Sequence, residues 1–181
     1  MPLWPPLLVL VAVMVAIVGI WPGGASQDDP EAAPPPPQYL AQGTVWQRYT
    51  VDGSLDLRAR ASDLRGYSGG RIELDDILLE RLGSEQRWQL QSPHGEIPPG
   101  AERLRLQGPV LGTGLRGAQA PLALDAGVIW VDRGARELTS DEPVRLESPE
   151  RYARAEGFTA DWQASRITLR GNVEIRHEAL R

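Results

Sequence analysis

A short phrase of alternating apolar and polar residues returns at nearly regular intervals along this chain, and it constrains the fold more than any other feature. Four segments carry the phrase: RIELDDILLE (71–80), RLRLQGPV (103–110), RELTSDEPV (136–144) and RITLRGNVEI (166–175). Their last apolar residues are spaced by 32, 34 and 29 positions: Leu78, Val110, Val144 and Val173. Alternation of period two is typical of a strand with one buried face. A repeat of this length indicates stacked units that bury a continuous apolar face together.

The rest of the region from Gln42 to Arg181 shows no long stretch of helical periodicity, and turn residues recur throughout it. The strongest expected strands share the alternation: 54–62, 71–80, 87–91, 103–108, 127–132, 143–148 and 166–176. Each is apolar on one side and polar or charged on the other, which is typical of an antiparallel sheet with one dry and one wet face. Two such faces close into a sandwich, a jelly roll or a barrel. The predicted fold class is therefore all-β and antiparallel, built from repeated hairpins.

Charge and the scarcity of reactive side chains argue against several classes of function. The chain has 24 acidic and 19 basic residues, a net charge of −5, which disfavours a nucleic-acid partner. It has no cysteine, so disulfides, thiolate catalysis, cysteine-bound zinc and a lipid anchor through cysteine are excluded. His94 and His177 lie far apart, and the adjacent carboxylates of Asp75 and Asp76 point to opposite faces of a strand. We expect no catalytic residue, no cofactor and no metal site.

The N-terminus is apolar enough to cross a membrane. The first 27 residues carry no charged side chain, and segment 7–20 is apolar apart from one glycine. With its apolar flanks the run would make about 28 Å of helix, close to the ~30 Å of a bilayer core. The sequence therefore predicts one transmembrane helix in an anchor over residues 1–24. A cleaved signal peptide, with the small residues 23–25 as its cleavage site, is the alternative.

A proline-rich linker is predicted over residues 25–41, followed by the β-domain over 42–181. The four consecutive prolines at 34–37 favour an extended spacer. The acidic residues Asp28, Asp29 and Glu31 directly after the span fit a domain outside the cytoplasm. The positive-inside rule has nothing to count, because no Lys or Arg precedes the span.

This organisation resembles the LptC family, the single-pass component of the lipopolysaccharide export system. The resemblance covers essentially the whole chain and is carried by recurring phrases: VDGSLDLRARA (51–61), RWQLQSPHGEI (87–97), RLRLQGPV (103–110), LTSDEPVRLES (138–148) and LRGNV (169–173). The chain departs from the family pattern in two places. It lacks basic residues before the span, and Glu142 stands where the other phrases have glycine or Asp76.

The resemblance implies a fold, partners and a location. The fold would be an OstA-like jelly roll, a taco-like twisted double sheet with an apolar groove for the acyl chains of lipid A. The partners would be lipopolysaccharide, the inner-membrane ABC transporter LptBFG and the periplasmic bridge protein LptA. The chain would be a non-catalytic relay in the cell inner membrane, with its C-terminal domain in the periplasm and energy supplied by the transporter.

The candidate groove residues are the inward positions of the expected strands, together with Thr44 near the membrane-proximal mouth. They are Thr44, Leu57, Ala59, Ala61, Ile72, Leu74, Trp88, Leu90, Leu104, Leu106, Val128, Trp130, Ile167, Leu169 and Val173. Several inward positions are small and Phe158 is the only phenylalanine, which is compatible with a slot, although most sandwiches fill this space with side chains. The alternative is a filled core, in which case the protein would be a membrane-tethered scaffold that only joins other proteins.

The last strand is the candidate edge for docking LptA. An unpaired sheet edge offers backbone groups to a strand of another chain. The expected edge residues are consecutive: Asn172, Val173, Glu174, Ile175, Arg176 and His177. An ordinary terminal strand is the alternative for this segment.

Overall fold

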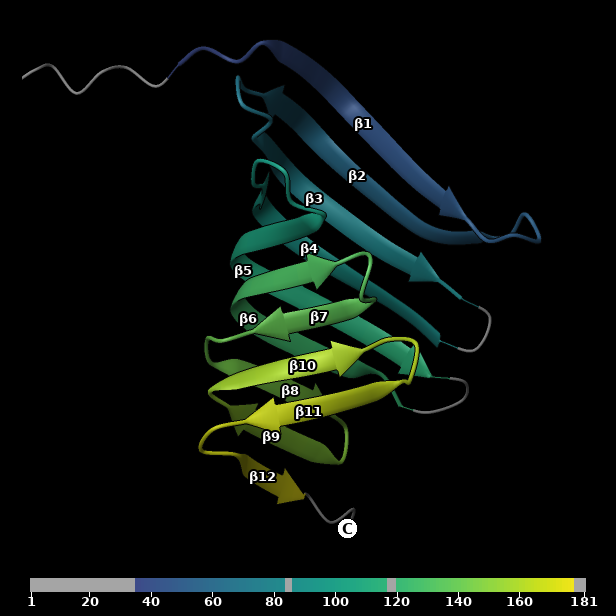
Figure 1. Cartoon of the computed structure of the whole chain (residues 1–181). Coiled ribbons are helices and arrows are strands. Elements are labelled where there is room, and N and C mark those ends of the chain that lie inside the picture. Colours follow the sequence, from purple (N-terminus) through teal and green to yellow (C-terminus); the bar gives the residue numbers. More distant parts are fainter. Residues whose placement is uncertain (1–34, 84–85, 117–119, 178–181) are drawn as a thin grey trace, which may run out of the picture. The chain divides into compact units, whose positions relative to one another are not determined.

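The computed structural model of the protein describes residues 35–83, 86–116 and 120–177. These residues form one antiparallel sheet of 12 strands, and no helix occurs among them (Figure 1). The strands are β1 (Tyr39–Tyr49), β2 (Leu55–Gly66), β3 (Ile72–Leu82), β4 (Gln86–Ile97), β5 (Arg103–Arg116), β6 (Leu122–Asp132), β7 (Glu137–Ser140), β8 (Val144–Ser148), β9 (Arg151–Ala155), β10 (Gly157–Asp161), β11 (Arg166–Arg170) and β12 (Glu174–His177). The predicted all-β antiparallel class is confirmed.

The predicted anchor over residues 1–24 and most of the predicted linker over 25–41 lie outside the described residues. Within the described ranges no helix is long and apolar enough to cross a membrane. Residues Pro36–Arg181 form one compact unit. Strand β1 begins at Tyr39, inside the range expected for the linker.

The sheet is a simple meander that branches after its sixth strand. From β1 to β6, strands that follow each other in sequence are paired in the sheet. The second half of β6 then pairs with β7, and its first half pairs with β8. One branch continues from β7 to β10 and β11, and the other from β8 to β9 and β12 (Figure 1). The chain alternates between the branches, so each late strand belongs to only one half of the sheet.

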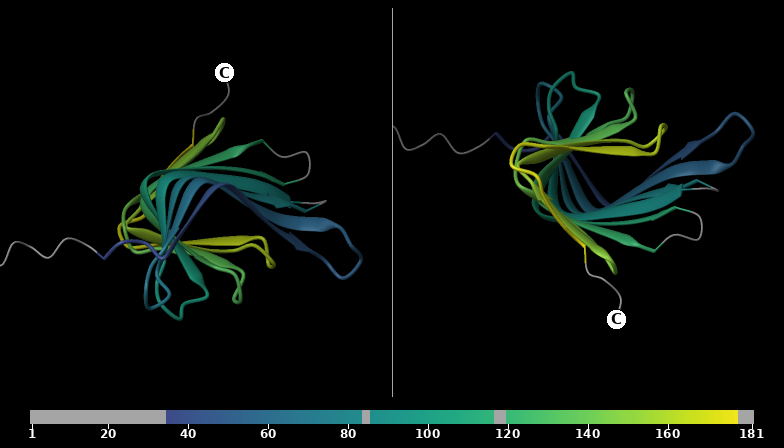
Figure 2. Two further views of the ribbon diagram at one scale, coloured as in Figure 1. Left: turned by 90° about the horizontal axis from the view of Figure 1, so that it is seen from above. Right: turned by 90° about the horizontal axis from the view of Figure 1, so that it is seen from below.

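The sheet is folded along a crease that runs across β1–β6, so that its two halves form the arms of a V (Figure 2). We call the arm that contains β8, β9 and β12 the first half-sheet, and the arm that contains β7, β10 and β11 the second half-sheet. Strict alternation fails at the crease. In β3, Leu74 and Ile77 line the same cavity although they are three positions apart. Two successive outward residues lie between them, and this bulge bends the strand.

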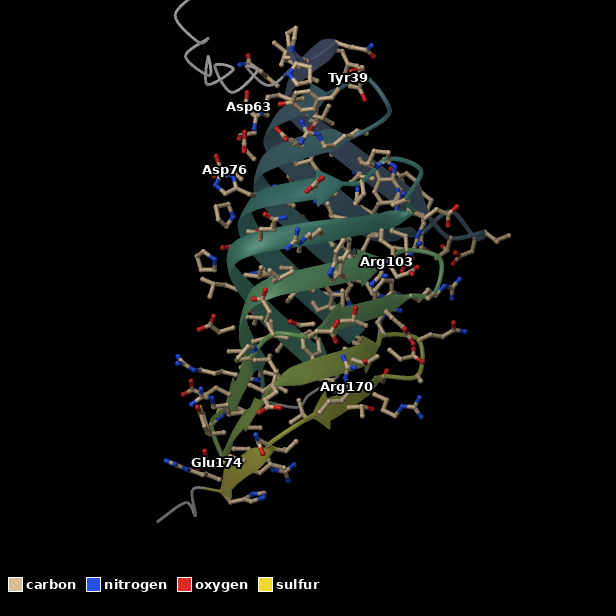
Figure 3. The ribbon with its side chains drawn as sticks, turned by 60° about the vertical axis from the view of Figure 1, so that its left-hand side comes forward. Tyr39, Asp63, Asp76, Arg103, Arg170 and Glu174 are labelled. Atoms are coloured by element: carbon tan, nitrogen blue, oxygen red, sulfur yellow. The ribbon has the colours of Figure 1, made fainter. Side chains whose placement is uncertain are left out.

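The repeated phrase of the sequence marks this crease. Asp76, Gly108 and Gly171 occupy equivalent positions in three of the phrases, and all three have positive φ, at 48°, 94° and 66°. This left-handed region is the one that glycine adopts without steric cost. Asp76, and Asp63 on the neighbouring strand β2, project on the outer side of the bend (Figure 3). The repeated phrase in the sequence thus marks where each strand bends at the crease, as well as which of its side chains form the apolar face.

Buried serines satisfy backbone groups that the crease removes from the strand ladder. The hydroxyl of Ser92 lies 2.8 Å from the carbonyl oxygens of His94 and Gln107 and accepts from the N–H of Gln107 at 3.2 Å. The hydroxyl of Ser140 accepts from the N–H of Glu142 at 3.1 Å. Both serines are buried. These bonds matter because an unpaired buried backbone group is costly.

The core lies between the half-sheets, near the crease. Its most completely buried side chains come from both arms: Phe158, Leu57, Leu106, Ile129, Val110, Val131 and Val144. The expectation of a single strand over 166–176 is wrong, since Gly171 and Asn172 separate β11 from β12 and both have positive φ. The phrase therefore contributes one strand to each half-sheet.

Candidate functional site

The space between the half-sheets, which we call the trough, contains two apolar cavities. The N-terminal cavity has a volume of about 210 Å³ and is lined by strands β1 to β6. Its lining includes Thr44, Trp46, Leu57, Ala59, Ala61, Ile72, Leu74 and Leu104. The C-terminal cavity has a volume of about 320 Å³. Its lining includes Trp88, Leu90, Leu122, Leu124, Leu138, Ala160, Trp162 and Ile167.

Packed pairs of side chains separate the two cavities, which share no lining residue. Leu79 and Leu90 are directly paired between β3 and β4, and one lines each cavity. Val131 and Leu138 are paired between β6 and β7, and again one lines each cavity. These buried pairs therefore lie between the two cavities and fill part of the trough.

The mouth of the N-terminal cavity, opposite the crease, is loosely covered. The guanidinium of Arg133, which follows β6 in the second half-sheet, lies 5.7 Å from the centre of the Trp46 ring in β1. Trp46 is 41% exposed. The Arg133 Nε also donates to the carbonyl oxygen of Glu102 at 3.2 Å. An exposed cation–π contact is worth only about 0.5–1 kcal/mol, so this contact holds the two arms together weakly.

Beside the C-terminal cavity the two arms are joined by contacts that we call the latch. Trp162, in the turn between β10 and β11, is only 4% exposed and packs on Trp88 with ring centres 5.5 Å apart. The Arg81 Nη1 donates to the Trp162 carbonyl oxygen at 3.1 Å and to the Gln86 Oε1 at 2.9 Å. The Ser165 hydroxyl donates to the same Gln86 oxygen at 3.2 Å. The latch thus joins the free end of the β10–β11 hairpin to the first half-sheet.

Most predicted groove residues lie in the trough. Seven line the N-terminal cavity: Thr44, Leu57, Ala59, Ala61, Ile72, Leu74 and Leu104. Trp88, Leu90 and Ile167 line the C-terminal cavity, whereas Leu106 is fully buried in the core and Leu169 packs against it. The sequence pattern correctly identified the dry face but did not divide it into two compartments.

Three predicted groove residues do not lie there. Val128 and Trp130 were assigned inward by strict alternation, but β6 reverses its inward side at the crease. Ile129 and Val131 are buried instead, and the Trp130 ring lies among the arginines of the outer face, 4.9 Å from the Arg103 guanidinium. Val173 lies between β11 and β12 and is 45% exposed.

The sequence analysis did not predict the residues that join the two arms beside the cavities. Trp162 sits in the polar turn segment DWQAS (161–165), where alternation gives no reason to expect a buried side chain. Arg81 and Arg133 lie just outside the strands expected over 71–80 and 127–132, so no inward or outward side was predicted for them. A tryptophan within an otherwise polar turn is the one available sign, because so large an apolar surface is rarely left in water.

Both ends of the sheet have unpaired edges among the described strands. Strand β1 pairs only with β2, β11 only with β10, and β12 only with β9. The predicted docking segment lies at one of these edges: Asn172 and Val173 precede β12, and Glu174, Ile175, Arg176 and His177 form it. All six are exposed. The segment therefore has the accessibility that strand addition requires.

The outer face of the N-terminal half carries an ion-pair network around Asp75. The Arg65 Nη1 lies 2.6 Å from the Asp75 Oδ2, and this bond lowers the pKa of that carboxyl from its usual range. The His94 Nδ1 lies 3.1 Å from the other oxygen. The phenol of Tyr67 donates to Glu73 at 2.7 Å, which raises the pKa of Tyr67. Among the described residues no group of three or more His, Cys, Asp or Glu could hold a metal ion.

Comparison with known proteins places the chain in a family. The family described as "Lipopolysaccharide-assembly, LptC-related" matches residues 7–178. The chain belongs to the LptC family. As a member of this family of transport components, which are not enzymes, it takes part in lipopolysaccharide transport. No curated protein matches the sequence.

A solved structure shows the same fold as this LptC-family chain. It is the crystal structure of LptH, the LptA homologous periplasmic component of the lipopolysaccharide transport device from Pseudomonas aeruginosa. The TM-score is 0.53 at 9% sequence identity, over 68% of this chain and 95% of that chain. At this identity the likeness concerns the fold, and the OstA-like jelly roll implied by the sequence resemblance agrees with it.

Proposed function

We propose that the protein is a lipopolysaccharide relay that holds the acyl chains of lipid A in its trough. The observation that carries this proposal is the N-terminal cavity, which is lined mostly by apolar side chains and has the exposed Trp46–Arg133 contact at its mouth. Each methylene kept out of water stabilises the complex by about 0.8 kcal/mol, so even part of an acyl chain binds such a surface.

The unpaired edges of β1 and β12 support a place for the relay between other proteins of the export system. We propose that the chain receives lipopolysaccharide from the inner-membrane ABC transporter LptBFG and passes it to LptA at the C-terminal edge formed by β12. The predicted N-terminal span would keep the domain at the periplasmic face of the inner membrane. The chain itself would bind and release lipid, while the transporter supplies the energy.

The scaffold alternative, with a filled core, has less support. Two cavities of about 210 and 320 Å³ are large for an interior that has only to be packed. Their linings are apolar, and apolar space of this kind suits a hydrocarbon chain better than ordered water. A protein that acted only as a scaffold would bind its partners through its outer faces and sheet edges, and it would not need apolar cavities.

Site-specific photo-crosslinking tests the proposal. A diazirine amino acid at Leu74 or Leu104, which line the N-terminal cavity, should give lipopolysaccharide adducts in membranes. The same group at Arg58 or Arg105 should not, because these positions neighbour inward Leu57 and Leu104 along their strands and face outward. Equal labelling at both sets of positions, or adducts at neither, would contradict a lipid-binding trough and favour the scaffold.

A further inference from the structure

We propose that Arg133 determines which headgroup the protein accepts, by binding a phosphate of the lipid at the mouth of the N-terminal cavity while an acyl chain lies inside. This inference rests on the proposed function, because it concerns the same cavity and the same ligand. It adds the chemistry of the part of the ligand that stays outside the apolar compartment. The ligand class is a lipid that carries a phosphate next to its acyl chains, as lipid A does.

The first argument is the charge of the two cavity linings. The described residues that line the N-terminal cavity include two arginines, Arg60 and Arg133, and no acidic residue. The lining of the C-terminal cavity contains one residue of each sign, Asp161 and Arg166, which are directly paired between β10 and β11. Of the two cavities, the N-terminal one therefore combines an apolar interior with an excess of positive charge.

The second argument is that the charge of Arg133 is not neutralised by a carboxylate. The other arginine of the lining, Arg60, pairs with Glu80 at 2.9 Å. Arg133 forms no ion pair among the described residues: its Nε donates to the backbone carbonyl oxygen of Glu102 at 3.2 Å, and its two Nη groups have no hydrogen-bond partner there. The Glu102 carboxylate lies beside Gly134 instead. The free Nη donors form the planar fork that binds phosphate oxygens in pairs.

The third argument is the position of this guanidinium at the boundary between the cavity and water. It lies 5.7 Å from the centre of the Trp46 ring on the opposite arm, and Trp46 is 41% exposed. An anionic group is costly to bury in an apolar compartment, so a lipid whose chain fills the cavity leaves its phosphate at this boundary. The chain has a net charge of −5 and repels an anion on average, and the unpaired cation at the mouth supplies local attraction.

Two lipids that differ only in their phosphates test the proposal. The full chain, with a diazirine amino acid at Leu74 in the N-terminal cavity, is titrated in detergent with diphosphoryl lipid A and with the same lipid A after removal of both phosphates. We expect half-maximal adduct formation at an about tenfold lower concentration of the phosphorylated lipid. Arg133→Gln should weaken binding of diphosphoryl lipid A about tenfold and leave binding of the dephosphorylated lipid unchanged, which also shows that the variant is folded. Arg133→Lys, which keeps the charge, should keep most of the preference.

The matched control is Arg136→Gln, which removes the same charge from the same connection between β6 and β7. The Arg136 Nη1 donates to the Gln163 side chain at 3.2 Å, and Arg136 lines neither cavity, so the tenfold preference should remain. An equal loss of affinity for both lipids in Arg133→Gln, or an equal effect of Arg136→Gln, would overturn the role of Arg133. Equal affinity of the unchanged chain for both lipids would overturn it as well, and would leave the proposed function standing. Binding of neither lipid would overturn the proposed function, and the role of Arg133 with it.

Discussion

The two cavities of the trough are built by the same folded sheet, but the contacts between the arms beside them differ. The N-terminal cavity lies between long strands, and an exposed tryptophan and an arginine cover it. The C-terminal cavity is larger, and a buried tryptophan and hydrogen bonds between the two arms lie beside it. The two arms are therefore joined by more contacts beside the C-terminal cavity than beside the N-terminal cavity.

The cause of the difference lies in the strands. Strands β1–β6 run through the crease, so continuous backbone ladders fix the angle between the arms there. After β6 each strand belongs to one arm only, and short connections such as Gly171 and Asn172 join the arms. Connections with left-handed backbone hold an angle less firmly than paired strands do. The latch therefore provides the contact between the arms that the ladder no longer supplies.

Replacement of Trp162 and of Trp46, which lie beside the two cavities, should give the largest difference in the free energy of unfolding. Trp162→Ala removes a buried indole and should lower the free energy of unfolding by about 3–5 kcal/mol. Trp46→Ala removes a half-exposed ring with one cation–π contact and should cost about 1 kcal/mol or less. Urea denaturation of both variants measures this, with Trp162→Phe as the control that keeps an aromatic ring. An equal loss of unfolding free energy in the two alanine variants would mean that the two tryptophans stabilise the fold equally.

The sequence predicted the architecture well because alternation and repeat length are properties of the local chain. It identified the all-β class and the dry face of most strands, including Leu57, Leu74 and Leu104. It did not predict that alternation reverses at the crease, and so it misplaced Trp130. A bulge is set by backbone geometry at one or two residues, and Asp76 with positive φ does not look different from any other polar residue in a strand.

The division of the trough could not be predicted from the sequence either. The latch joins Arg81 to Trp162 and Gln86 to Ser165, which are 81 and 79 positions apart. Such contacts depend on the fold angle of the sheet, which no local pattern specifies. Small inward residues did indicate spare volume. Where that volume lies depends on which large side chains of the opposite arm meet them.

Replacement of Arg81 and of Arg133 should give a smaller difference in the free energy of unfolding. Arg81→Met keeps the apolar stem but loses the charged hydrogen bond to the Trp162 carbonyl, and we expect it to destabilise the protein by about 2 kcal/mol. Arg133→Met loses an exposed ring contact and should cost about 0.5–1 kcal/mol. Hydrogen exchange of the β10–β11 hairpin should accelerate in the Arg81 variant alone. Acceleration in both variants, or in neither, would argue against a local latch.

The contribution of the ion-pair network on the outer face of the N-terminal half to the free energy of unfolding should be smaller still, and it should depend on pH. The pKa of Asp75 is lowered in the folded protein, chiefly by its hydrogen bond with Arg65. Its contribution to stability is therefore complete above the unfolded pKa of 3.8 and is lost as the pH falls through the lower folded value. Asp75→Asn should cost less than about 1 kcal/mol at neutral pH, since the ion pair is partly exposed.

Thermal unfolding between pH 7 and pH 2 measures the effect of Asp75→Asn. The variant should show a shallower loss of stability below about pH 4 than the unchanged chain does. Arg170, whose pair with Asp141 is exposed, provides the control in the C-terminal half: Arg170→Gln should leave the pH profile unchanged. An identical acid slope for Asp75→Asn would show that this network does not stabilise the fold.

The most direct test of the whole account is to fill each cavity and measure the affinity for lipopolysaccharide. Ala59 lines the N-terminal cavity and Ala160 the C-terminal cavity, and both are partly buried. Ala59→Trp should weaken binding about tenfold or more, and Ala160→Trp should weaken it less, because the N-terminal cavity carries the proposed lipid site. Circular dichroism confirms that each variant is folded. Unchanged affinity in a folded Ala59→Trp protein would contradict the claim that the trough binds lipid.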